Sequence, residues 1–144
     1  MNELEEKFYE TGVVPVVVLE DAEDAVPLAQ ALVEGGLLSA EVTFRTAAAE
    51  ESIRRMTEAF PQMLVGAGTV LTKEQVDAAA AAGAKFMPTG GINAGNLTEY
   101  LSCDKILCCG GSWMVKGDLV KAGDFGKIRE LSAETRKLVD TIRK

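Results

Sequence analysis

Residues 13–19, Val-Val-Pro-Val-Val-Val-Leu, decide the fold class of this chain. Because the run is apolar at every position, it predicts a strand buried on both faces, as the strands of parallel sheets are. Comparable runs predict further strands at 40–44, 63–67, 85–87 and 106–109. Helical periodicity separates these runs, so we predict an α/β protein with about five parallel strands.

The segments between the strands carry the 3.6-residue spacing of amphipathic helices. Asp21 and Thr72 are expected to cap two of these helices, because a short polar side chain accepts hydrogen bonds from the first free N–H groups. No linker or low-complexity tract is visible, so we expect one domain over residues 1–144. The predicted helices cover residues 3–10, 25–33, 47–59, 74–82, 94–101 and 125–142.

The composition limits the partners that the chain can bind. It has 144 residues, 47% of them hydrophobic, and a net charge of −7. Nucleic acids and anionic membranes repel such a surface, so we expect neither as a partner. No apolar run approaches the roughly 20 residues of a spanning helix, and the first residues are acidic, unlike a basic signal sequence. We predict a cytoplasmic protein that binds a small molecule.

Histidine is absent and cysteine is scarce. Without histidine, the usual general base and the Ser-His nucleophile pair are excluded, so any chemistry must use groups such as Glu, Lys or Arg. Cys103, Cys108 and Cys109 follow neither a disulfide framework nor a metal-ligand spacing. We interpret them as buried thiols and expect no metal site.

Two double-glycine segments follow apolar runs, Pro88-Thr89-Gly90-Gly91 and Gly110-Gly111-Ser112. Glycine lets a ligand approach the backbone, and the free N–H groups at the start of a following helix attract an anion. In (β/α) barrels the phosphate site commonly lies on the loops after the last two strands. We predict a phosphorylated small-molecule ligand; the alternative is that both segments are ordinary strand-to-helix turns.

Glu41, Thr43 and Arg45 alternate along the second predicted strand and should share one face. Glu41 could then serve as an acid or base, while Arg45 grips a carboxylate or phosphate. The alternative is an internal ion pair between them. Further along, Gly66-Ala67-Gly68-Thr69-Val70 would let a ligand approach a strand end and offers the Thr69 hydroxyl, although an ordinary turn has the same pattern.

Five blocks of the chain, taken together, resemble the family of 2-keto-3-deoxy-6-phosphogluconate (KDPG) and 4-hydroxy-2-oxoglutarate (KHG) aldolases. Their order matches the family over most of the chain. The blocks are Val14-Pro15-Val16-Val17, Glu41-Val42-Thr43-Phe44-Arg45-Thr46, Gly66-Ala67-Gly68-Thr69-Val70, Pro88-Thr89-Gly90-Gly91-Ile92 and Gly110-Gly111-Ser112-Trp113.

The resemblance implies a class I lyase on a (β/α)₈ barrel, typically a trimer, without metal or organic cofactor. Such an enzyme cleaves KDPG to pyruvate and glyceraldehyde 3-phosphate, or KHG to pyruvate and glyoxylate, through a Schiff base on a lysine. The phosphorylated keto-deoxy sugar acid and pyruvate are the implied ligands, and a homo-oligomer is the implied assembly. By the same likeness Glu41 would shuttle protons, Arg45, Thr69 and Thr89 would hold the pyruvate portion, and Gly90, Gly91, Gly111 and Ser112 would bind the phosphate.

The chain departs from the family between Gly83 and Pro88. There the family carries three further strand-helix units, including the Lys-Phe-Phe-Pro strand with the Schiff-base lysine. We interpret the chain as an incomplete (β/α)₈ barrel produced by an in-frame internal deletion. Lys85 stands three residues before Pro88, as the family's lysine stands before its own proline. It either takes over the catalytic role or is a structural or solvent-facing lysine.

The deletion also makes predictions about topology and function. The right-handed crossover rule places the strand at 85–87 beside the strand at 63–67, with the helix at 74–82 between them. Removing three units should leave two open sheet edges, which invite pairing with another chain. The functional hypotheses are a lyase of impaired activity, a non-catalytic binder of a phosphorylated ligand, or a truncated remnant without function.

Overall fold

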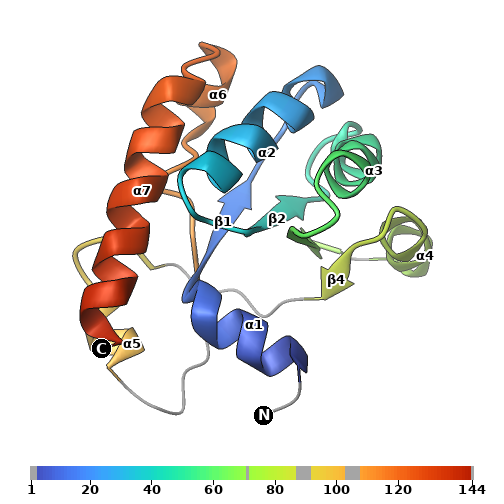
Figure 1. Cartoon of the computed structure of the whole chain (residues 1–144). Coiled ribbons are helices and arrows are strands. Elements are labelled where there is room, and N and C mark those ends of the chain that lie inside the picture. Colours follow the sequence, from blue (N-terminus) through green and yellow to red (C-terminus); the bar gives the residue numbers. More distant parts are fainter. Residues whose placement is uncertain (1–2, 71, 87–91, 103–107, 144) are drawn as a thin grey trace.

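The computed structural model describes residues 3–70, 72–86, 92–102 and 108–143. Its centre is a five-stranded sheet in the order β4-β3-β2-β1-β5, and every pairing in it is parallel (Figure 1). The predicted α/β class and the five parallel strands are therefore confirmed. The strands are β1 (Val13–Val17), β2 (Ser39–Thr43), β3 (Leu64–Gly68), β4 (Lys85–Phe86) and β5 (Cys109–Gly111).

Seven α-helices and one short 3₁₀ segment are assigned among these residues. The helix predicted at 125–142 has the observed bounds, whereas α6 was not predicted because it has only five residues. The elements are α1 (Glu3–Thr11), the 3₁₀ segment η1 (Ala22–Asp24), α2 (Ala25–Glu34), α3 (Ala49–Ala59), α4 (Lys73–Ala81), α5 (Leu97–Leu101), α6 (Gly117–Lys121) and α7 (Phe125–Ile142).

Polar caps fix where several helices begin. Thr72 forms a reciprocal capping box with Gln75, as the sequence predicted, and Asp124 caps α7 by accepting from the Lys127 N–H. The expected cap of α2 by Asp21 is wrong, because Asp21 accepts from the Glu23 N–H and caps η1 instead, while Asp24 precedes α2 without a side-chain cap. Each such cap contributes about 1 kcal/mol to helix stability.

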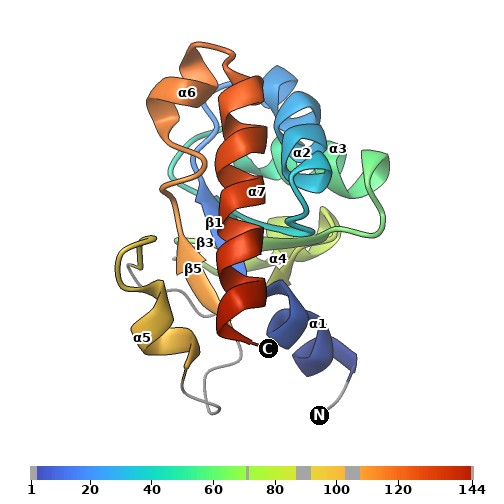
Figure 2. The ribbon, with the colours of Figure 1, turned by 60° about the vertical axis from the view of Figure 1, so that its left-hand side comes forward.

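One face of the sheet is covered by helices α2, α3 and α7 (Figures 1 and 2). Leu28 and Leu32 of α2, Ile53 of α3 and Ile128 of α7 are fully buried in this layer. Each buried side chain of this size contributes about 1.5–3 kcal/mol through the hydrophobic effect. The same layer receives Val42 of β2, while its neighbour Glu41 lies on the opposite face because side chains alternate along a strand.

The fifth strand lies later in the chain than expected. The sequence predicted a strand at 106–109, but residues 106 and 107 lie outside the described part and β5 runs from Cys109 to Gly111. Gly110 and Gly111 are therefore strand residues that pair with Val14 and Pro15, not a turn. A turn in which the Val115 N–H donates to the Ser112 carbonyl (3.1 Å) separates β5 from α6, so no helix begins directly at the glycines.

The chain that leaves one edge strand soon contacts the strand at the other edge. β4 pairs with β3, as the crossover rule predicted, and lies at one edge of the sheet. Six residues later Ile92 forms a parallel bridge with Gly111, on the strand at the other edge. Six residues span at most roughly 20 Å when extended. The sheet therefore curves back toward itself as an incomplete barrel, and the β5 edge is occupied at one point by the chain's own backbone.

Candidate active site

The carboxyl ends of β1, β2 and β5 surround a pocket of about 500 Å³, here called the carboxyl-end pocket. It brings together residues from four of the five sequence blocks, namely Val16, Arg45, Ile92 and the segment from Gly110 to Ser112. Ligands of parallel α/β sheets bind at this end of the strands. The lining residues are Val16, Val18, Arg45, Ile92, Gly110, Gly111, Ser112, Val115, Lys116 and Gly117.

Two cations line the carboxyl-end pocket. Arg45 is exposed there, and Lys116 faces the same space from the turn before α6. No salt bridge involving either side chain occurs with the residues that the structure describes. In a chain of net charge −7, two such cations in one pocket are suited to an anionic ligand. Lys116 was missed from the sequence because nothing in its local pattern distinguishes it from a surface lysine.

Glu41 is almost completely buried, with 2% of its surface exposed. Its Oε2 atom, and the Oγ1 of Thr43 on the same face, have no hydrogen-bond partner in the described part of the chain. Burial raises the pKa of the Glu41 carboxyl, and the positive charge of Arg45 partly offsets this rise. The two residues do not form a salt bridge, so the alternative of an internal ion pair is wrong. A carboxyl with a raised pKa is suited to proton transfer near neutral pH.

Gly68 provides the space for the Glu41 carboxyl. A Cβ built on Gly68 would stand 1.7 Å from the Glu41 Oε1, so any side chain there would displace the carboxylate. The small residues at the end of β3 therefore accommodate a side chain of the protein itself, whereas the sequence suggested that they admit a ligand. Thr69 follows as an exposed residue with a left-handed φ of 54°, which turns the chain sharply at the end of this strand.

Gly111 is a glycine for a comparable reason. A Cβ on it would lie 2.0 Å from Cζ3 of Trp113, so the indole packs directly over its backbone. The Trp113 Nε1 donates to the Thr135 Oγ1 of α7 at 3.1 Å. Trp113 thus holds the end of β5 against α7 and fixes the wall of the pocket on which exposed Ser112 lies.

Four predicted site residues are described by their backbone alone or not at all. Thr89, Gly90 and Gly91 lie outside the described residues. Lys85 belongs to β4, where its backbone pairs with Gly66 of β3. Of the predicted thiols, Cys109 is buried and Cys108 is half-buried, whereas Cys103 is outside the described part.

A second pocket, of about 480 Å³, lies at the amino end of the sheet against α1 and α7. Its two cations are already neutralised, because Lys7 pairs with Glu3 and Arg136 pairs with Asp140. Among the described residues, no cluster of histidine, cysteine or acidic side chains could hold a metal ion, and no helix is long and apolar enough to cross a membrane. The carboxyl-end pocket is therefore the candidate site.

Comparison with known proteins identifies the family. The sequence model of the "KDPG and KHG aldolase" family matches residues 4–87 and again residues 84–131. The chain belongs to this aldolase family. The two matched segments overlap at residues 84–87, which include β4.

Named relatives and solved structures agree with this assignment. The chain is 34% identical to the 2-dehydro-3-deoxy-phosphogluconate aldolase of Treponema pallidum, over 88% of this chain and 93% of the relative, and 31% identical to the KHG/KDPG aldolase of Escherichia coli K12, over 90% and 93%. The KDPG aldolase of Legionella pneumophila, captured with pyruvate as a covalent carbinolamine, has a TM-score of 0.81 at 28% identity over 90% of this chain and 97% of that one. The Zymomonas mobilis ZM4 aldolase with 3-phosphoglycerate has a TM-score of 0.78 at 30% identity over 93% and 95%.

The alignments with these two named relatives are longer than the chain itself. The match to the Treponema pallidum aldolase is 195 residues long, whereas this chain has 144 residues. Some positions of the relative therefore have no counterpart in this chain, although the match covers 93% of the relative. The match thus spans most of both sequences.

Proposed function

We propose that this chain binds a phosphorylated 2-keto-3-deoxy sugar acid in the carboxyl-end pocket and cleaves it as a class I aldolase. The preferred substrate is KDPG, which would give pyruvate and glyceraldehyde 3-phosphate; KHG, which would give pyruvate and glyoxylate, is the related substrate. The observation that carries the proposal is the pairing of a cationic pocket, with Arg45 and Lys116, with a buried Glu41 whose carboxyl has an unpartnered oxygen. No metal or organic cofactor is required by this chemistry.

The reaction follows from the groups available. A lysine amine adds to the C2 keto carbon of the substrate and water leaves, which gives an imine that can accept electrons. Glu41 takes the proton of the C4 hydroxyl, and the C3–C4 bond breaks as its electron pair moves into the imine, giving an enamine and the aldehyde. Protonation of the enamine at C3, followed by addition of water to the imine, releases pyruvate and restores the amine.

We assign the binding roles from the family blocks and from the pocket. Arg45 grips the substrate carboxylate with its planar guanidinium, and Ser112 and Lys116 hold the phosphate at the end of β5. Gly111 contributes by letting Trp113 shape the wall. From the family resemblance we also assign Thr69 and Thr89 to binding the pyruvate portion of the substrate, and Gly90 and Gly91 to binding its phosphate.

We further propose that the chain lost three adjacent strand-helix units at the position of β4, including the family's lysine strand. The two family matches that overlap at residues 84–87, and an alignment longer than the chain, support this proposal. A cytoplasmic location and a homo-oligomer are also proposed, the latter because the β4 edge pairs on one side only among the described residues.

The decisive experiment measures both binding and cleavage. KDPG binding is followed by calorimetry, and pyruvate release by coupling to lactate dehydrogenase. We expect Ser112→Ala to weaken KDPG binding, and Glu41→Gln to leave binding nearly unchanged while cleavage falls. Equal losses of affinity in both variants would contradict this division of roles.

The second candidate function is binding without cleavage. It is favoured by one observation, because both cations that line the pocket among the described residues, Arg45 and Lys116, lie outside β4. In that case KDPG binds and no pyruvate is released. A folded protein that neither binds nor cleaves KDPG would instead be the remnant considered from the sequence.

A further inference from the structure

The backbone pairing places Lys85 level with Glu41 across one intervening strand. Glu41 pairs with Gly66, and Gly66 in turn pairs with Lys85, so positions 41, 66 and 85 form one row across the sheet. Residues in register on parallel strands lie on the same side of the pleat. Neighbouring strands are about 4.8 Å apart, so the two outer positions of this row are separated by roughly 10 Å.

The residue between them has no side chain. Gly66 is buried in the middle of β3 and presents only backbone in this row. The row ends on Val16 of β1, which lines the carboxyl-end pocket. A substrate over Gly66 would therefore lie beside the Glu41 carboxyl, which reaches over Gly68 of the same strand, and beside the backbone position of Lys85 on the next strand.

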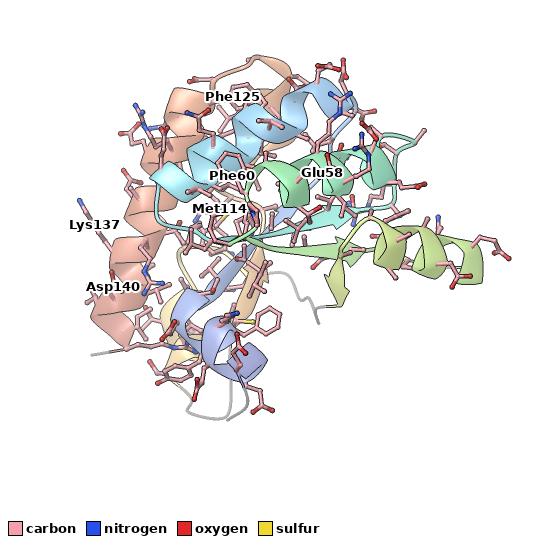
Figure 3. All side chains as sticks on the ribbon, turned by 45° about the vertical axis from the view of Figure 1, so that its right-hand side comes forward. Glu58, Phe60, Met114, Phe125, Lys137 and Asp140 are labelled. Carbon is pink, nitrogen blue, oxygen red and sulfur yellow. The ribbon has the colours of Figure 1, made fainter. Side chains whose placement is uncertain are left out.

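Several other described lysines are poorly placed for this reaction. Lys7 and Lys127 are exposed and pair with Glu3 and Glu130 on their own helices. Lys137 points outward from α7 in Figure 3. Lys116 does line the pocket, but it lies there with Arg45 among the residues suited to anion binding.

From this row we infer that Lys85 is the lysine that forms the imine with the keto acid, a catalytic position on β4 that the shortened chain uses together with Glu41. The inference rests on the proposed function, since an imine is useful only to a keto-acid aldolase. The covalent step is balanced: the amine forms a C–N bond to the keto carbon, and the carbonyl oxygen leaves as water.

The inference is tested by trapping the imine with pyruvate. Reduction by borohydride converts an imine into a stable secondary amine, and peptide mass mapping then locates the modified lysine in the unaltered protein. We expect one pyruvate adduct on the peptide that contains Lys85. Mapping needs no variant, so the test does not depend on whether a substituted protein folds.

Three variants sharpen the result. Lys85→Arg keeps the positive charge but provides no amine, and the adduct should be lost; Lys116→Arg and the exposed helix control Lys121→Arg should retain it. An adduct on Lys116 would overturn the assignment to Lys85 while leaving the aldolase proposal intact. Binding of KDPG without any adduct would overturn the inference and favour the non-catalytic binder, whereas loss of binding altogether would refute the proposed function.

Discussion

Glu41 and Val42 are neighbours in β2 and are equally inaccessible, with 2% and 0% of their surfaces exposed, yet their surroundings differ. Val42 enters the apolar layer beneath α2 and α3. Glu41 lies on the opposite face, where its Oε2 and the Thr43 Oγ1 have no hydrogen-bond partner among the described residues. One face of the sheet is therefore apolar and packed against helices, whereas the other buries polar atoms without partners among the described residues.

The energetic difference between the two faces is large. Burial of an aliphatic side chain contributes about 1.5–3 kcal/mol, whereas burial of a polar group without a partner costs about 1–3 kcal/mol. A raised pKa lessens the cost for Glu41, because the carboxyl is more readily protonated. Residues that destabilise a fold in this way are typical of catalytic sites.

The largest effect is expected from a change on the face of the sheet that carries Glu41. Replacing Glu41 by glutamine keeps the shape of the side chain but removes its acid-base function. Cleavage of KDPG should fall by about 10²–10⁴-fold, the usual contribution of a general acid or base, while stability toward urea should stay equal or rise. The control is Glu50→Gln on the exposed side of α3, and cleavage that survives Glu41→Gln would contradict the assigned role.

The next largest effect is expected in the apolar layer between the sheet and helices α2, α3 and α7. Ile53 is fully buried in α3, so Ile53→Ala should lower the free energy of unfolding by about 2–5 kcal/mol through lost burial and a residual cavity. Urea unfolding measures this loss, and Glu50→Ala on the same helix should change stability by less than about 0.5 kcal/mol. KDPG affinity per folded molecule should be unchanged in the Ile53 variant; a large loss of affinity would mean that the two faces are not independent.

A smaller effect is expected at the rim of the pocket. Replacing Arg45 by alanine removes a charge-assisted contact worth about 1.5–3 kcal/mol, so KDPG affinity should fall by roughly 10–100-fold. Calorimetry at fixed ionic strength measures this change. The surface arginine variant Arg54→Ala serves as control because Arg54 pairs with Glu51 and Glu58 on its own helix and does not line the pocket among the described residues. An unchanged affinity would place the ligand elsewhere.

The smallest effect concerns the dependence of stability on pH. Burial raises the pKa of Glu41 above its unfolded value. The folded state therefore binds more protons than the unfolded state between these two values, and stability falls as pH rises through the raised pKa, by at most about 1.4 kcal/mol per pH unit. Glu41→Gln lacks this loss, so its stability relative to the natural chain should increase with pH. A constant difference across urea titrations from pH 4 to pH 8 would contradict the raised pKa.

The sequence determined the elements because most of their signals are local. The apolar run at 13–19 and the helical spacing at 125–142 need no distant partner to be recognised, and β1 and α7 lie where they predict. Thr72 was identified as a cap because capping involves residues three apart. The family blocks, the parallel strands and the place of β4 beside β3 also followed from the sequence.

Tertiary structure alone decided which small residues serve a ligand and which serve the protein. Gly68 makes room for Glu41 because β2 and β3 are paired in the sheet, and Gly111 makes room for Trp113 because the chain after β5 folds the indole back over the strand. The same long-range pairing puts Gly110 and Gly111 into β5 and adds Lys116 to the pocket. It also aligns the backbone of Lys85 with that of Glu41 through Gly66. Register is a property of several strands at once, and for that reason the sequence could name these residues but could not place them relative to one another.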